Sequence, residues 1–242
     1  MHSIWLGEFA GTLVLVLLGC GVNAGVTLRK TFASDGGWFV ITTGWALAVL
    51  CGVLTAKAFG SPAAQLNPAI TLASAIAGGD TSQVLVCWSA QLAGAMCGAV
   101  LMALHFAPHW KLTEDAGAKL GVFCTHAAVR SPLANIFSEI VGTAVLVVVA
   151  AAIGSRGVAA NGPAVGVAPW LVCCLVWGVG LSLGGTTGYA INPARDLGPR
   201  IVHALLPIPG KGGSDWSYAP IPIVGDLIGA ALAGLLLHYA RF

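Results

Sequence analysis

The sequence predicts an all-α membrane protein with six transmembrane helices and two re-entrant half-helices, arranged as two inverted repeats. Of its 242 residues, 57% are apolar and only 8% are charged, whereas a soluble globular domain carries roughly 25% charged residues. The apolar residues gather in blocks near the length of about 20 residues that a helix needs to cross a bilayer. In addition, three short motifs occur twice in the same order along the chain.

The apolar blocks set the number and position of the predicted spans. They lie at roughly 4–25, 38–58, 84–106, 133–153, 165–184 and 219–239. The first block contains Glu8 and has neither a basic flank nor a small-residue cleavage site, so it is typical of a retained span rather than a signal peptide. We therefore expect a multi-pass protein of a cell membrane (inner or plasma membrane), with the lipid bilayer as its solvent.

Charge and cysteine usage exclude several function classes. The net charge is only +2 and the chain has no basic cluster, so no nucleic-acid partner is expected. The seven cysteines show no metal-ligand spacing, and neither a metal nor a cofactor is predicted. No nucleophile, base and orienting group are brought together by the sequence, so an enzyme is not expected.

The repeated motifs define two halves with the same plan. The pairs are 8–12 with 139–143, 66–69 with 191–194, and 91–95 with 226–230. Each half reads as span, span, short piece and span, and because three is odd, the second half enters the membrane from the opposite side. This pattern predicts one domain, 1–242, built from inverted repeats at about 1–106 and 133–242 that meet at a pathway. The polar stretch 107–132 between them is predicted to be a surface loop.

The short pieces carry the chemistry of the predicted pathway. Asn67 and Asn192 each precede a proline, and asparagine at the N-cap with proline at the first helical position is a strong helix start. About ten helix-compatible residues follow each proline, too few to span a bilayer. Two such helix starts meeting head to head near the midplane would present two amide donors and two positive dipole ends to a conduit.

One cation lies on the same helical face as the second asparagine. Arg195 follows Asn192 by three residues, so its guanidinium faces the same conduit as the amide. Five fixed donors and a permanent charge suit it to binding hydroxyl groups while repelling cations. Asp196 is interpreted either as a partial counter-charge or as an anchor for the surrounding loop.

These residues resemble the major intrinsic protein family, the aquaporins and glycerol facilitators, over nearly the whole chain. The doubled Asn-Pro-Ala box and the glutamates that open corresponding spans carry the resemblance. It implies a homotetramer with one pore per subunit, passive flux, and both termini in the cytoplasm, although the loop charges favour the opposite orientation. It also implies that Glu8 and Glu139 brace the half-helix loops through backbone N–H groups, the alternative being a proton relay.

The resemblance further implies a selectivity constriction. Its four positions correspond to Trp45, Gly180, Tyr189 and Arg195, with Gly44 as an alternative to Trp45. This set resembles the glycerol-conducting branch: the aromatic rings would face CH groups, Gly180 would leave room for a three-carbon chain, and Arg195 would bond the hydroxyls.

Two positions depart from the family pattern. Gln65 stands where the family commonly has histidine, and Gln65 and Leu66 are placed by the resemblance at the pore lining near the first box. Asp226 replaces an uncharged residue, and it is interpreted either as a carboxyl hydrogen-bonded between helices or as a pore or gating residue.

The sequence therefore predicts a passive channel for glycerol and other small neutral polyols, with water as a lesser substrate, that excludes ions and protons. A water-selective channel, or one conducting lactic acid or urea, is an alternative on the same fold. An ion-coupled secondary transporter is a further alternative, because inverted repeats and broken helices occur in that class too.

Overall fold

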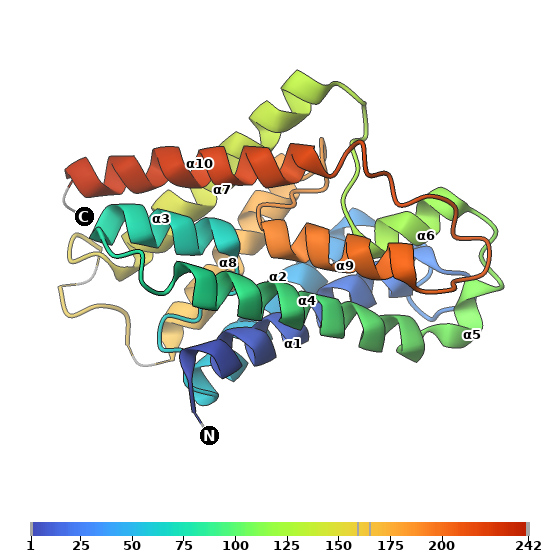
Figure 1. Cartoon of the computed structure of the whole chain (residues 1–242), viewed down its shortest axis with the longest axis horizontal. Helices are drawn as coiled ribbons and strands as arrows, with labels where there is room; N and C mark the ends of the chain where they lie inside the picture. Colours follow the sequence, from blue (N-terminus) through green and yellow to red (C-terminus); the bar gives the residue numbers. More distant parts are fainter. Residues whose placement is uncertain (1, 159, 165, 241–242) are drawn as a thin grey trace.

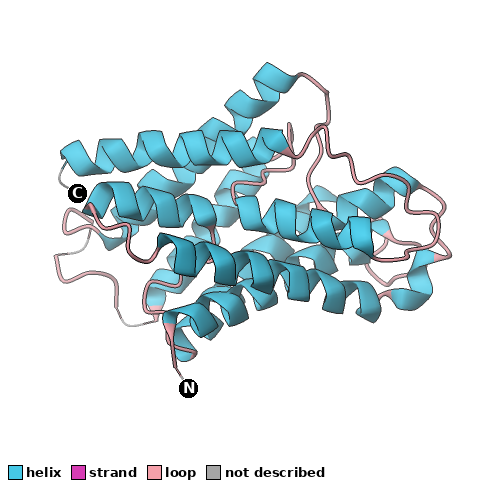
Figure 2. Cartoon of the chain, viewed as in Figure 1, coloured by secondary structure: helices cyan, strands magenta, loops and turns pink. Residues whose placement is uncertain are grey.

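The computed structural model describes residues 2–158, 160–164 and 166–240, and these form α-helices joined by loops and turns (Figure 2). The helices are α1 (Ile4–Thr27), α2 (Gly37–Ala58), α3 (Pro68–Gly78), α4 (Val84–His105), α5 (Ala107–Trp110), α6 (Ala116–Phe123), α7 (Pro132–Gly154), α8 (Val167–Leu183), α9 (Pro193–Leu205) and α10 (Pro220–Ala240). The predicted all-α class is confirmed.

Long apolar helices form the body of the molecule. Among the described residues, α1, α2, α4, α7 and α10 have 21 to 24 residues each and are apolar enough to cross a membrane. The fifth predicted span corresponds to α8, which has 17 residues and so reaches about 26 Å at 1.5 Å per residue. The predicted start of that span, residue 165, lies outside the described residues. The start of α1 and the end of α10 lie toward one end of the bundle, and α5 and α6 lie at the other (Figure 1).

The two short helices begin as the asparagine–proline pairs predict. The side chain of Asn67 accepts a hydrogen bond from the Ala69 N–H at 2.8 Å and caps α3. Asn192 caps α9 by accepting from the N–H groups of Ala194 at 3.0 Å and Arg195 at 3.2 Å. The two helices have 11 and 13 residues, which is too short to span a bilayer.

Glycines allow the long helices to approach closely in corresponding places of the two halves. On α4, a Cβ atom added at Gly94 would lie 2.3 Å from the Phe9 carbonyl oxygen of α1. On α10, a Cβ at Gly229 would lie 2.5 Å from the Ile140 carbonyl oxygen of α7. Both distances are far inside van der Waals contact, so each helix pair depends on a glycine, as is usual where membrane helices pack by small residues.

The connection between the halves corrects the prediction of a surface loop. It contains α5 and α6, and several of its side chains are buried, among them Trp110, Lys119, Val122 and Phe123. Polar residues in this stretch satisfy both local and distant backbone groups: Asp115 caps α6 by accepting from the Gly117 N–H at 2.7 Å, and the Lys119 ammonium donates to the Pro209 carbonyl. The polarity of the stretch therefore reflects capping and hydrogen bonding rather than exposure alone.

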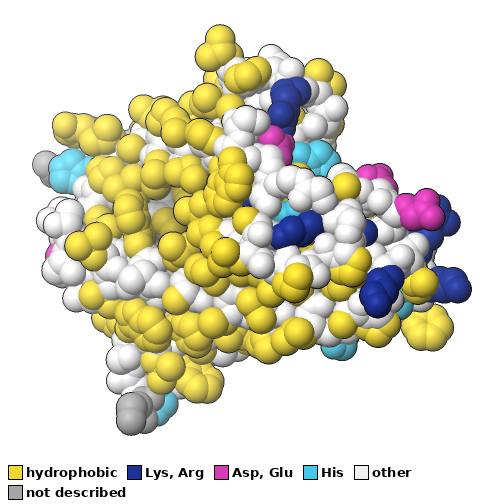
Figure 3. Space-filling model, turned by 45° about the vertical axis from the view of Figure 1, so that its right-hand side comes forward, with side chains coloured by type: hydrophobic (Ala, Val, Ile, Leu, Met, Phe, Trp, Pro, Cys, Tyr) yellow, Lys and Arg dark blue, Asp and Glu magenta, His cyan; other side chains and the backbone are white. Residues whose placement is uncertain are grey.

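The surface of the bundle suits a bilayer. Apolar side chains cover most of the face in Figure 3, and charged side chains gather toward its right-hand end. Leu85, Leu133 and Phe137 are 77%, 84% and 65% exposed on the outer faces of long helices. Exposure of large apolar side chains on this scale is costly in water and is favourable in lipid.

Substitution of Gly94 tests the close approach of α1 and α4. We expect Gly94→Ala to lower stability by about 1–3 kcal/mol, the usual cost of overpacking, because the added methyl group collides with the Phe9 carbonyl. Thermal unfolding of the detergent-solubilised protein measures the change. Gly178→Ala on α8 is the control, because a Cβ there meets nothing within 4 Å, and equal loss of stability in both variants would contradict the argument.

Candidate functional site

Two cavities approach each other inside the bundle. The midplane cavity, about 280 Å³, is lined by both capping asparagines, by Gln65 and Leu66 and by apolar side chains of α2, α7 and α8. The mouth cavity, about 920 Å³, is lined by α6, by the segment that follows it and by the loop after α8. Three buried residues, Trp45, Tyr189 and Arg195, line both cavities. They form the boundary between the cavities, which we call the constriction.

Arg195 and Trp45 form one side of the constriction. The Arg195 Cζ lies 4.0 Å from the centroid of the Trp45 ring, which is cation–π contact. The indole Nε1 of Trp45 donates to the Asn23 side-chain oxygen at 3.0 Å, and Asn23 in turn donates to the carbonyls of Gly121 and Val122. Gly44, the alternative to Trp45, lines neither cavity. It packs against α1, where a Cβ added at Gly44 would lie 2.6 Å from Val22.

Part of the Arg195 guanidinium remains available. Its Nη1 is buried and has no hydrogen-bond partner among the described residues. Leaving a buried charged donor unpaired costs several kcal/mol unless water or a ligand satisfies it. Because Arg195 lines both cavities, this donor is placed to bond whatever occupies the constriction.

Tyr189 fills the space that the sequence assigned to solute beside Gly180. A Cβ added at Gly180 would lie 2.8 Å from the Tyr189 ring, and Gly180 is not among the residues that line either cavity. Its carbonyl accepts from the Trp38 Nε1 at 3.1 Å, and Trp38 packs edge-on against Tyr189. The expectation that Gly180 itself leaves room for solute is therefore corrected: the missing side chain makes room for the tyrosine ring.

The capping asparagines join the two halves. The Asn67 Nδ2 donates to the Ile191 carbonyl at 2.7 Å, and the Asn192 Nδ2 donates to the Leu66 carbonyl at 2.9 Å. Each amide nitrogen carries two hydrogens, so one N–H of each asparagine is used across the interface and one remains for the midplane cavity. The capping pattern predicts amide donors that face the conduit, but it does not reveal the bonds to carbonyls in the opposite half.

The segments before the two asparagines have an unusual backbone. Ala64 and Leu66 have φ of 46° and 54°, and Tyr189 and Ile191 have φ of 39° and 44°. Such left-handed conformations in non-glycine residues cost about 1–3 kcal/mol each and persist only when the surroundings hold them. They occur three residues and one residue before each asparagine, so the two halves share the same strained path.

Two buried glutamates hold this backbone. Glu8 accepts from the N–H groups of Gln65 at 2.8 Å and Leu66 at 2.7 Å. Glu139 accepts from the N–H groups of Ala190 at 3.1 Å and Ile191 at 3.0 Å. Charge-assisted bonds of this kind are roughly twice as strong as neutral ones, and they leave the carbonyl groups of the segments free to face the cavity or the opposite asparagine.

The first half has further polar contacts around Glu8. Glu8 also accepts from the Ser61 hydroxyl at 2.6 Å and from the Gln91 amide at 2.8 Å. Gln91 donates as well to the Thr71 hydroxyl at 3.0 Å, and Thr71 donates to the Gln65 side chain at 2.8 Å. The Gln65 side chain is thus oriented through α3 and α4 while it lines the midplane cavity.

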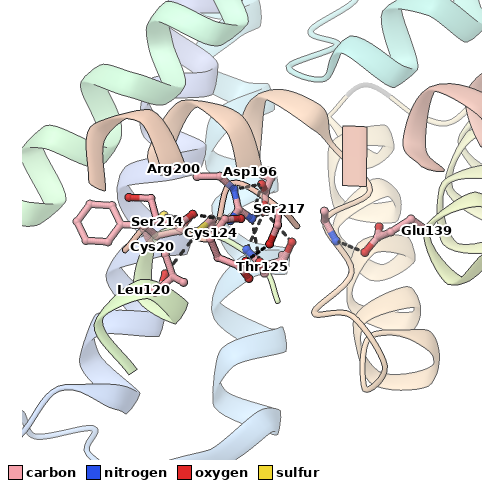
Figure 4. Close-up of polar contacts among 12 residues, drawn as sticks. Cys20, Leu120, Cys124, Thr125, Glu139, Asp196, Arg200, Ser214 and Ser217 are labelled. Carbon is pink, nitrogen blue, oxygen red and sulfur yellow. Dashed lines mark hydrogen bonds and ion pairs between the residues drawn. The ribbon is translucent and has the colours of Figure 1, made fainter. Parts of the chain in front are cut away.

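A buried ion pair on α9 also forms hydrogen bonds to the outer loops (Figure 4). Asp196 and Arg200 are fully buried, and the Arg200 Nε donates to Asp196 at 2.9 Å. Asp196 also accepts from the Thr125 N–H at 2.7 Å and hydroxyl at 2.6 Å, and Arg200 donates to the Ser214 carbonyl at 2.9 Å. Of the two interpretations of Asp196, the contacts show the loop anchor.

A second ion pair lies at the mouth cavity. Arg130 forms an ion pair with Asp215, and Ser217 donates to the same carboxyl at 2.9 Å. Burial alone would raise the pKa of Asp215, but the hydrogen bonds from Arg130 and Ser217 hold that pKa below its ordinary value. The carboxylate is therefore ionised at neutral pH, and the mouth carries balanced charge.

Several contributors were not found by sequence reasoning. Asn23, Trp38, Ser61 and Thr125 position the constriction or the bracing glutamates through long-range contacts. Only Asn23 left a signal, since it is a polar residue near the end of an apolar span. Within the described ranges, no group of three or more side chains is arranged to hold a metal ion.

Comparisons with known proteins show the family to which the chain belongs. The model of the major intrinsic protein family matches residues 2–237. The chain is 50% identical to a probable glycerol uptake facilitator protein of Thermotoga maritima over 98% of this chain and 99% of the relative. It is 48% identical to the glycerol uptake facilitator protein of Bacillus subtilis, over 99% of this chain and 85% of the relative.

A more distant relative and a solved structure extend the comparison. A D/L-lactic acid transporter of Lactiplantibacillus plantarum is 34% identical over 98% of this chain and 97% of the relative. The fold matches the X-ray structure of the aquaglyceroporin from Plasmodium falciparum with a TM-score of 0.82, covering 95% of this chain and 92% of that chain at 24% identity. The chain is a multi-pass membrane protein, and it belongs to the major intrinsic protein family.

Proposed function

We propose that the chain is a passive channel that conducts glycerol and other small neutral polyols, with water as a lesser substrate. The observation that carries the proposal is the constriction between the two cavities. There the rings of Trp45 and Tyr189 lie with a guanidinium donor of Arg195 that has no partner among the described residues. The names of the relatives that are about half identical to this chain, glycerol uptake facilitators, support the same solute.

The chemistry of a polyol fits the two kinds of surface at the constriction. Its hydroxyl oxygens accept from Arg195, and its CH edge packs against the Trp45 and Tyr189 rings. A solute with one polar and one apolar edge thereby loses its water shell without leaving donors or acceptors unpaired, whereas an ion does not. The permanent charge of Arg195 also repels cations.

The midplane adds a second barrier to charge. The remaining N–H groups of Asn67 and Asn192 bind the oxygen of a passing water or hydroxyl, and both half-helices point their positive ends at it. A water held by its oxygen at this point does not pass a proton along the file. In this proposal Glu8 and Glu139 are braces rather than proton carriers, and Gln65 and Leu66 line the path below the constriction.

Assembly and orientation complete the proposal. A homotetramer with one conduit in each subunit, in a cell membrane with both termini in the cytoplasm, suits the apolar outer faces and the conduit that lies inside a single chain. With this orientation the mouth cavity opens to the outside.

Light scattering of vesicles that contain the pure protein tests the function. An inward glycerol gradient should produce rapid, non-saturating swelling without any sodium or proton gradient, because the conduit has no described ion site to couple. Vesicles without protein give the baseline. Saturation at low concentration, or a requirement for an ion gradient, would identify a coupled transporter, and faster flux of lactic acid than of glycerol at acidic pH would favour the lactic acid alternative.

Gly180→His tests the role of the constriction in selecting the solute. The added side chain must displace the Tyr189 ring, so glycerol flux should fall by about tenfold or more while water flux falls much less. Paired osmotic and glycerol-gradient measurements on the same vesicles give the ratio. Gly178→Ala, where a Cβ meets open space, should leave both fluxes unchanged. Equal loss of glycerol and water flux in Gly180→His would contradict the assignment.

Arg195→Ala tests the exclusion of charge. Removal of the guanidinium opens the constriction and takes away its fixed positive charge, so urea flux should rise relative to glycerol and a cation conductance should appear in planar bilayers. The exposed Arg156, in the segment after α7, provides the control Arg156→Ala. An unchanged urea-to-glycerol ratio together with no conductance would remove Arg195 from the filter.

A further inference from the structure

Asp226 is a carboxyl group inside the bundle that the proposed conduction path does not use. It lies in the first third of α10 and is fully buried. Its Oδ1 accepts from the Thr143 hydroxyl at 3.1 Å, and its Oδ2 has no partner among the described residues. Glu139 lies one turn before Thr143 on α7, and a Cβ added at Gly225, the residue before Asp226, would lie 2.6 Å from the Glu139 Cβ, so the two carboxyl groups lie on facing turns of α7 and α10.

The first half shows what the corresponding position does. Gln91 on α4 occupies the place in its repeat that Asp226 occupies on α10, and each is followed three residues later by the glycine that packs against the neighbouring long helix. The Gln91 amide donates to the bracing Glu8 at 2.8 Å. An ionised aspartate cannot make the corresponding bond to Glu139, because it has no hydrogen to donate.

The charges around Asp226 do not supply a cation for it. Helices α7, α3 and α9 pack against α10. On α7 the only titratable group is Glu139, and α3 has none. The titratable groups of α9 are Arg195, Asp196, Arg200 and His203. Tyr218 lies two residues before the start of α10. Among these, Arg200 is paired with Asp196, and no hydrogen bond or ion pair joins a cation to Asp226 among the described contacts. Two buried carboxyl groups on facing turns of α7 and α10, without a cation and at bilayer depth, cannot both be ionised.

We propose that Asp226 is a neutral carboxylic acid whose O–H donates to Glu139, and that it is a positioning residue for the conduit. The proton belongs on Asp226 because both Glu139 oxygens already accept backbone N–H bonds, whereas the Asp226 Oδ2 has no partner among the described residues. The protonated aspartate thus does in the second half what the Gln91 amide does in the first. Through Glu139 it holds the N–H groups of Ala190 and Ile191 in the strained segment before Asn192, a consequence that rests on the proposed conduction path.

Infrared spectroscopy of the reconstituted protein at neutral pH tests the protonation state without any flux measurement. The wild type should show a carbonyl band of a protonated carboxylic acid, and incorporation of aspartate labelled with carbon-13 at the side-chain carboxyl should shift it. Asp226→Asn should remove the band, whereas the control Asp80→Asn, at an exposed loop position, should keep it. The absence of a band in the wild type, or a band that aspartate labelling does not shift, would overturn the proposal.

Flux measurements test the positioning role. Asp226→Asn keeps a donor of nearly the same shape and should keep glycerol flux near that of the wild type. Asp226→Leu keeps the volume and loses the donor, so flux should fall several-fold relative to the amount of folded protein. Wild-type flux in Asp226→Leu, or an equal loss in Asp226→Asn, would overturn the positioning role. If the wild type conducts water but not glycerol, the proposed solute fails while the same comparison on water flux still tests Asp226.

Discussion

Two half-helices meet by their positive ends at the centre of this molecule because each capping asparagine bonds the backbone of the other half. The crossed bonds from Asn67 to the Ile191 carbonyl and from Asn192 to the Leu66 carbonyl offset the repulsion between the two helix dipoles. They also fix the distance between the halves. The midplane cavity and the placement of the constriction next to it follow from this contact.

The crossed bonds require carbonyl groups that point inward, and this requirement explains the buried glutamates. Non-helical backbone at bilayer depth survives only where protein or a water-filled cavity satisfies its polar groups. Glu8 and Glu139 take the N–H groups, while the asparagines and the cavity take the carbonyls. Four non-glycine residues of these two segments then remain in left-handed conformations, and the bonds of Asp196 to Thr125 and of Arg200 to the Ser214 carbonyl hold α9 beside them.

Features that depend on local sequence could be predicted, and features that depend on distant partners could not. The half-helix starts at Pro68 and Pro193 follow from asparagine capping, and the long helices agree with the apolar blocks within a few residues. The ring of Tyr189 over Gly180 could not be predicted, because it depends on how the loop after α8 folds back. The burial of the segment around Lys119 was missed for the same reason: polar residues there satisfy distant carbonyls.

The repeat also explains why the constriction lies on one side of the midplane only. Ala64 and Ile70 in the first half stand where Tyr189 and Arg195 stand in the second, three residues before and three residues after the capping asparagine. All four line the midplane cavity, but the small and apolar pair neither narrows its side nor adds a charge to it, whereas the aromatic ring and guanidinium narrow theirs. The symmetric backbone thus places the donors at the centre, and two differences in side chain place the filter on the side of the mouth cavity.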